Sequence, residues 1–100
     1  MVIEWLRFRV PASLHAAFLE RDAHVWTAAL KRYPGFISKE TWTEPDTHDI
    51  IAVIRWQRLE DWKSIPRSDL EYLDDEMGEL LFPVVECKTF ETAPERLQTV

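Results

Sequence analysis

The stretch AHVWTAALKRYPGF, residues 23–36, decides how the rest of the chain is arranged. It reads as the end of an amphipathic helix, followed by Tyr33-Pro34-Gly35-Phe36 and then by a strand. Proline cannot continue a helix, and glycine suits the left-handed residue that ends one, so we expect the chain to reverse here. The residues before this stretch predict one strand and the helix that follows it. The residues after it predict a hairpin, a second helical region and a last strand.

The first strand is predicted at Val2 to Val10, with large apolar side chains on both faces, as in a strand that is covered on both sides. One face alternates through Val2, Leu6, Phe8 and Val10, with Glu4 as the exception. Ser13 is the predicted N-cap of a helix that runs to about Tyr33.

At 100° per residue this helix carries a broad apolar arc. The arc consists of Leu14, Phe18, Leu19, Val25, Trp26, Ala29, Leu30 and Tyr33. Two polar residues, His15 and Asp22, lie inside it.

Two strands, Phe36 to Thr43 and Asp49 to Trp56, are predicted to form a hairpin around the turn Glu44 to His48. The second of them is the most apolar run of the chain and should be a central strand. A short helical turn, Leu59 to Ile65, is predicted to follow and to be broken by Pro66.

Ser68 to Glu71 has the form of a capping box at the start of a second helix. Its apolar stripe consists of Leu70, Leu73, Met77, Leu80 and Leu81. The acidic run Asp74-Asp75-Glu76 lacks the ligand spacing of a calcium loop, so we interpret it as a solvated helix face. Pro83 should end the helix, and Val84 to Phe90 is the last predicted strand.

The predicted order is βαββαβ, which is the ferredoxin-like α+β arrangement. Right-handed crossovers place both helices on one face of a four-stranded antiparallel sheet. The other face then needs cover, and Trp5, Ile51 and Val53 are expected to lie on it. We expect one domain, residues 1–91, followed by a polar tail at residues 92–100.

Composition limits the classes of function. The chain has 100 residues and a net charge of −6, which argues against general nucleic-acid binding because phosphate backbones are repelled. Cys87 is the only cysteine, so no intrachain disulfide is possible. No secretory signal and no membrane-spanning run is found, so we expect a cytoplasmic protein. Hydrophobic residues make up 46% of this short chain, an apolar load that either a Trp-rich monomer core or a subunit interface would bury.

Several residues resemble those of a known superfamily. The pattern Phe18, Asp22, Trp26, then Pro34-Gly35-Phe36 and Lys39-Glu40-x-Trp42, with Trp56 and Trp62 later, is similar to the dimeric α/β barrels. Within that superfamily the chain, over about residues 2–91, resembles the small domains that are like antibiotic biosynthesis monooxygenases.

The resemblance implies a homodimer whose two sheets form a barrel, with a pocket between each sheet and its helices. Some relatives oxygenate aromatic polyketides without metal or flavin, so we expect no cofactor. Others degrade haem by using an Asn, a Trp and a His. This chain has no Asn and no His after His48, so that set of residues cannot be transferred.

Asp22 and His15 are the candidate catalytic residues. A carboxylate inside an apolar arc is costly unless it is paired. Asp22 is therefore either an acid or base at the pocket, or a buried cap or salt bridge, for which Lys39 and Arg55 are the candidate partners. The near-neutral pKa of histidine would suit proton transfer by His15, although such residues are more often partly exposed. The three histidines are too scattered for a metal site, and none is expected.

Four tryptophans and a lysine are the candidate ligand-binding residues: Trp26, Trp42, Trp56, Trp62 and Lys39. The indoles could stack on a flat substrate, or they could simply fill the core and the dimer seam.

Lys39 could cluster with Arg7, Arg9 and Arg55 to hold a carboxylate or phosphate. These cations could equally pair with acidic residues across the strands.

Three functions stay open. The first is a cofactor-independent oxygenase, or a related small enzyme, that acts on an aromatic or polyketide-like molecule. The second is a module that binds a small apolar ligand without catalysis. The third is a protein whose role is its dimer.

Overall fold

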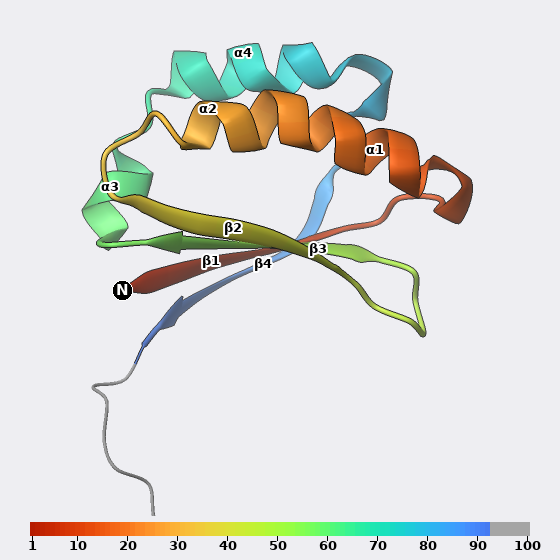
Figure 1. Cartoon of the computed structure of the whole chain (residues 1–100), viewed down its shortest axis with the longest axis horizontal. Helices are drawn as coiled ribbons and strands as arrows, with labels where there is room; N and C mark the ends of the chain where they lie inside the picture. The colour runs from red at the N-terminus through yellow and green to blue at the C-terminus, as the bar shows by residue number, and fades with distance from the viewer. Residues whose placement is uncertain (93–100) are drawn as a thin grey trace, which may run out of the picture.

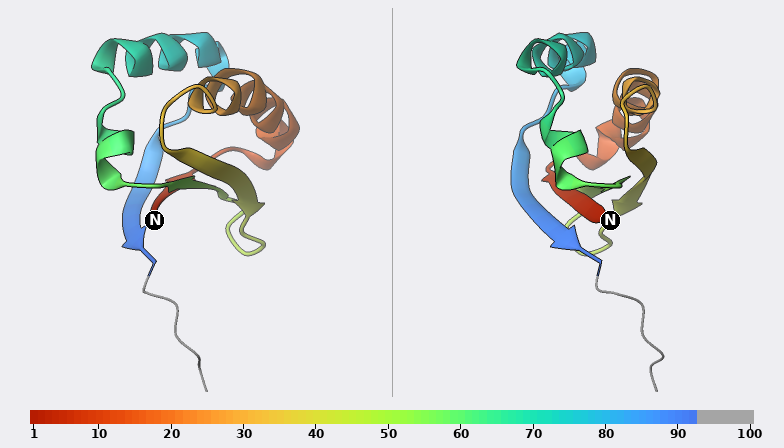
Figure 2. Two further views of the ribbon diagram at one scale, coloured as in Figure 1. Left: turned by 60° about the vertical axis from the view of Figure 1, so that its left-hand side comes forward. Right: turned by 90° about the vertical axis from the view of Figure 1, so that its left-hand side faces the viewer.

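The structure is a computed structural model, and it describes residues 1–92 of the chain. The two long helical segments lie side by side, in one layer, on the same side of a four-stranded sheet (Figures 1 and 2). The strands are β1 (Val2–Phe8), β2 (Phe36–Thr43), β3 (Ile50–Trp56) and β4 (Val84–Glu91). The helices are α1 (His15–Asp22), α2 (Ala28–Leu30), α3 (Leu59–Lys63) and α4 (Arg67–Met77).

The sheet is antiparallel, with the order β2-β3-β1-β4. This order and the helices on one face confirm the predicted ferredoxin-like α+β fold, and β3 is a central strand as expected. The predicted tail, residues 92–100, falls outside the described residues apart from Thr92, whose N–H donates to the carbonyl of Met1 at 3.0 Å.

The first long helical segment is continuous, but its hydrogen-bonding pattern changes along its length. A 3₁₀ turn at Ala12–Leu14 leads into α1, and a π-helical stretch at Ala23–Thr27 joins α1 to α2. The predicted N-cap at Ser13 is wrong, because the chain enters the helix through the turn that begins at Pro11, and no side chain caps it. The helix also ends earlier than predicted, at Leu30.

The reversal at Gly35 occurs as predicted. Gly35 has φ of 85°, a left-handed conformation that glycine adopts without steric cost. A Cβ on this residue would lie 2.1 Å from Oδ2 of Asp61, so the turn also needs the absence of a side chain. The carbonyl of Gly35 accepts a hydrogen bond from the N–H of Gln57 at 2.8 Å, which ties the turn to the end of β3.

The second long helix begins before the predicted capping box. Pro66 precedes the first helical residue of α4, and its carbonyl accepts the N–H of Asp69 at 3.0 Å. Ser68 therefore lies inside the first turn and caps nothing, because proline with its fixed φ already starts the helix. The α-helix ends at Gly78, whose φ is 58°, rather than at Pro83.

A bulge in β2 changes which residues face the helices. Phe36 pairs with Trp56 and Ser38 pairs with Arg55, so Ile37 is the extra residue. The prediction put Phe36 on one face with Trp42, which is wrong because the bulge shifts the alternation by one residue. Phe36 instead packs edge-on against Trp56 on the helix side, with ring centroids 5.9 Å apart.

The core between sheet and helices is divided into two clusters. One consists of Val10, Phe18, Ile50, Met77 and Leu80, and the other of Leu30, Ile54, Trp56 and Ile65. A cavity lies between them, and it is lined by members of both.

The outer face of the sheet needs less cover than predicted. Ile51 and Val53 are already buried within one chain, beneath cross-strand neighbours such as Trp42 and Trp5. Trp5 itself is half-buried, because the guanidinium of Arg7 and the ammonium of Lys88 lie over its ring at 5.2 and 4.9 Å from its centroid. The apolar side chains that stay exposed on this side are Ile37, Trp42, Val85 and Phe90.

Candidate functional site

The sheet–helix cavity has a volume of about 560 Å³. That is within the usual range for sites that bind small molecules, about 300 to 1,000 Å³. Its wall is mainly apolar and includes Leu6, Phe8, Phe18, Leu30, Ile54 and Met77. Exposed lining residues, namely Leu70, Leu81 and Val84, mark its opening between α4 and the start of β4. Four ionisable side chains also line it: Glu4, Asp22, Lys39 and Asp74.

Asp22 and Lys39 form an ion pair in the cavity wall. The Nζ of Lys39 lies 2.5 Å from Oδ2 of Asp22, and only 3% and 10% of the two side chains are exposed. Asp22 comes from the end of α1 and Lys39 from β2, so the pair also links the helix to the sheet. Of the partners considered from the sequence, Lys39 is therefore the one found, and Arg55 pairs with Glu40 instead.

Trp26 and Trp62 both line the cavity. Trp26 lies on the π-helical stretch, four residues after Asp22, and such stretches are frequent at functional sites because they re-aim side chains. Trp62 comes from α3, and the ammonium of Lys63 lies 4.2 Å from its ring centroid. Both indoles thus form part of the wall that a bound ligand would contact.

Glu4 was missed as a site residue. Its Oε1 accepts a hydrogen bond from Nε1 of Trp56 at 3.1 Å. Burial raises the pKa of Glu4, while the Trp56 hydrogen bond and the charges of Lys63 and Lys39 oppose that rise. Its position in the sequence could have indicated this role, because Glu4 is the single carboxylate on the face of the first strand that carries Val2, Leu6 and Phe8.

Asp74 is not on a solvated helix face as predicted. It is partly buried and lines the cavity, because it lies on the same side of α4 as Leu70 and Met77. Burial raises its pKa, and the adjacent charge of Asp75 adds to the rise.

The other three candidate residues do not line the cavity. Trp56 is fully buried and contacts the site only through its hydrogen bond to Glu4. Trp42 lies on the outer face of the sheet and is 47% exposed. His15 stands at the start of α1, where its Nε2 donates to the carbonyl of Val10 at 2.9 Å.

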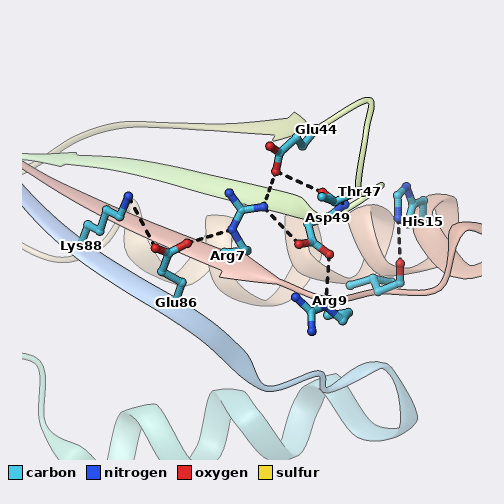
Figure 3. Close-up of polar contacts among 9 residues, drawn as sticks. Arg7, Arg9, His15, Glu44, Thr47, Asp49, Glu86 and Lys88 are labelled. Atoms are coloured by element: carbon cyan, nitrogen blue, oxygen red, sulfur yellow. Dashed lines mark hydrogen bonds and ion pairs between the residues drawn. The ribbon is translucent and has the colours of Figure 1, made fainter.

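The outer face carries a separate polar cluster around Arg7 (Figure 3). Arg7 contacts the carboxylates of Glu44, of Asp49 at 3.1 Å and of Glu86 at 3.0 Å. The hydrogen bond from Arg7 lowers the pKa of Glu44. Burial opposes the ionisation of Asp49, but Arg7 and Arg9 prevail and lower its pKa. This network fastens the β2–β3 turn to the sheet, so these arginines are paired rather than free for a ligand.

Neither a cluster of metal-ligating side chains nor a membrane-spanning helix is found in residues 1–92. No group of three His, Cys, Asp or Glu side chains in this part of the chain is close enough to hold a metal ion. No histidine among these residues lines the cavity. No helix among them is long and apolar enough to cross a bilayer.

Comparisons with solved structures agree on the fold. A monooxygenase from Streptomyces coelicolor, solved with the ligand nanaomycin D, matches with a TM-score of 0.73 and 15% identity, over 98% of this chain and 92% of its own. A cofactor-independent oxygenase from Streptomyces nogalater matches with a TM-score of 0.70 and 22% identity, over 98% and 97%. A haem degrader from Mycobacterium tuberculosis, with two haems in its active site, matches with a TM-score of 0.72 and 17% identity, over 96% and 99%.

No protein-family model and no curated protein sequence matches the chain. The chain thus has the fold of the structures related to antibiotic biosynthesis monooxygenases, and the resemblance expected from the sequence is confirmed for the fold. At such low identities the residues that act must be argued from this chain alone.

Proposed function

We propose that this chain is a small enzyme of the cofactor-independent monooxygenase type, which acts on a flat aromatic molecule of polyketide kind. The observation that carries the proposal is the Asp22–Lys39 ion pair, held in the wall of a mainly apolar cavity beside Trp26. Two structures that share this fold support the proposal: the nanaomycin D complex for the ligand, and the cofactor-independent oxygenase for the type of reaction.

Asp22 would act as the base. An acidic C–H or phenolic O–H of the substrate would give its proton to the carboxylate, whose second oxygen Oδ1 accepts nothing from residues 1–92. The electron-rich anion then reacts with dioxygen. At a methylene carbon one oxygen atom becomes the new carbonyl oxygen, and the other leaves as water with the two hydrogens. Lys39 would hold the carboxylate of Asp22 in place through the ion pair.

A matched pair of variants tests the role of Asp22. Oxygen uptake is measured with anthrone as the probe, with the uncatalysed reaction subtracted, and aromatic binding is measured separately by quenching of tryptophan fluorescence. Wild type should accelerate uptake. The double variant Asp22→Asn/Lys39→Met, which leaves no unpaired charge, should bind the aromatic but lose the acceleration. Turnover that survives in this folded variant would refute the role of Asp22 as base.

A binding module without catalysis is the second candidate. It is favoured by the short Asp22–Lys39 contact, because a buried carboxylate paired with an ammonium is also what a purely structural salt bridge would show. Wild type would then bind aromatics and take up no oxygen with any of them.

We further propose that the protein acts as a homodimer that joins the outer faces of two sheets. A second copy related by a two-fold axis would cover the exposed apolar side chains of this face, Ile37, Trp42, Val85 and Phe90. The Arg7–Glu86 and Arg55–Glu40 pairs on the same face are already neutralised within one chain. Light scattering at low micromolar concentration should give about 24 kDa, twice the 11.9 kDa of one chain. A mass of 11.9 kDa would contradict the dimer.

A further inference from the structure

We propose that Glu4 recognises the ligand: as a carboxylic acid it donates a hydrogen bond to an uncharged oxygen acceptor, such as a ketone or quinone carbonyl, and the cavity rejects ligands that carry a carboxylate. This inference rests on the proposed function, because it names the ligand class of the same cavity.

The position of Glu4 is fixed from one side. It lies in the middle of β1, between Val2 and Leu6 on the face toward the helices, and its Oε1 accepts the Nε1–H of the fully buried Trp56. One carboxyl oxygen is thus held by the core, which orients the other.

The second oxygen, Oε2, is available to a ligand. Within residues 1–92 it has no hydrogen-bond partner. No completely buried side-chain nitrogen or oxygen in this part of the chain lacks a partner, so Oε2 is open to the space of the cavity. A proton on Oε2 would therefore point toward bound molecules rather than toward protein.

Burial, rather than the charges around it, favours the neutral form of Glu4. Among the described residues that line the cavity, Lys39 is the one cation, and it is engaged by Asp22. Lys63 on α3 lies over the ring of Trp62, and its charge acts on Glu4 from a distance. Asp74 on α4 adds another acid to the wall. Burial prevails over both lysines and raises the pKa of Glu4, which keeps the proton on the carboxyl to higher pH.

The same charges disfavour anions. A carboxylate in this cavity would find no unpaired cation among the described lining residues, so a single hydrogen bond from Glu4 would have to offset the desolvation of a full charge. Burying a charge without a partner is costly, whereas a carbonyl oxygen needs only one donor.

Three probes of one shape separate these effects. Fluorene is a flat hydrocarbon, 9-fluorenone adds a carbonyl, and 9-fluorenone-2-carboxylate adds a charge. Their affinities for the whole chain are measured by quenching of tryptophan fluorescence. Fluorenone should bind wild type about 3- to 10-fold more tightly than fluorene, which is the range of one net hydrogen bond. The carboxylate should bind more weakly than fluorenone.

Variants assign the difference to Glu4. Glu4→Gln keeps a neutral donor, so it should hold fluorenone about as tightly as wild type. Glu4→Leu should lose the preference for fluorenone over fluorene. Glu40→Gln, on the outer face, is the control and should change neither affinity. Raising the pH until Glu4 ionises should weaken the binding of fluorenone to wild type but not to Glu4→Gln.

Each failure has a distinct result. If Glu4→Gln loses as much affinity as Glu4→Leu, or if the carboxylate binds as tightly as fluorenone, the inference about Glu4 is overturned. If fluorene and fluorenone bind wild type equally, the inference falls while aromatic binding stands. If none of the probes binds, the proposed function fails and the inference fails with it.

Discussion

Replacing Asp22 alone by Asn should lower the stability of the protein substantially. The change leaves the ammonium of Lys39 without its partner, although its side chain is only 3% exposed. Breaking a buried pair in this way costs about 3 to 5 kcal/mol. Since the cavity can admit water to the freed ammonium, we expect a smaller cost of about 2 to 4 kcal/mol. For a domain of this size that lowers the melting temperature by about 8 to 30 °C.

The double variant Asp22→Asn/Lys39→Met provides the comparison. It removes both charges, and replacing a buried pair by neutral groups is often close to neutral for stability. Urea unfolding of wild type, both single variants and the double variant gives the coupling energy between the two side chains. A single Asp22→Asn variant that loses less than about 1 kcal/mol, the value of an exposed pair, would refute the argument from burial. This cycle also explains why turnover is better tested in the double variant.

Three further predictions concern other parts of the chain. Burial raises the pKa of Glu4 above its ordinary value of 4.5, so wild type should lose stability as pH rises through the raised pKa. In thermal melts the melting temperature of Glu4→Gln relative to wild type should therefore increase from pH 4 to pH 8. A difference in melting temperature that stays constant over this range would contradict the prediction. Gly35→Ala should lower the free energy of unfolding in urea by about 2 to 5 kcal/mol, because the left-handed φ is strained for alanine and its Cβ would clash with Asp61. Adding Asp61→Gly removes the clash and should restore about 1 to 3 kcal/mol of that stability. Arg7→Met should lower the melting temperature at pH 7. The loss should shrink as pH falls through the pKa values of Glu44 and Asp49, which Arg7 holds below their ordinary 4.5 and 3.8, because the two carboxyls then become protonated in wild type as well. An equal loss at neutral pH and in strong acid would show that packing, not charge, matters.

The order of the elements could be predicted because its signals are local. Pro34 and Gly35 end one helix and Pro66 precedes another, and each acts through its own backbone. Caps were less predictable: Ser13 and Ser68 both have suitable chemistry, yet a neighbouring proline starts the helical turn first in each case.

The candidate site was predicted only in part. Both faces of β1 and β3 carry apolar residues, so the pattern does not say which face meets the helices. The spacing of residues in β2 did exclude one combination of the candidate site residues. Lys39 and Trp42 are three residues apart in one strand, so they lie on opposite faces and could not both line one cavity. Asp74 lies on the same helical stripe as Leu70 and Met77. The acidic residues next to it in the sequence led to the wrong prediction that it is on a solvated face.

The cavity has a consequence for the protein without ligand. A dry void of about 560 Å³ would cost about 13 kcal/mol at 24 cal/mol per Å³, which is close to the whole stability of an ordinary domain. The free protein must therefore fill this space with water. A ligand that displaces the water should give binding a negative heat-capacity change, and it should raise the melting temperature with the logarithm of its concentration above the dissociation constant. In so short a chain the bound molecule would complete the hydrophobic core, joining the Phe18 and Trp56 clusters that the protein alone leaves apart.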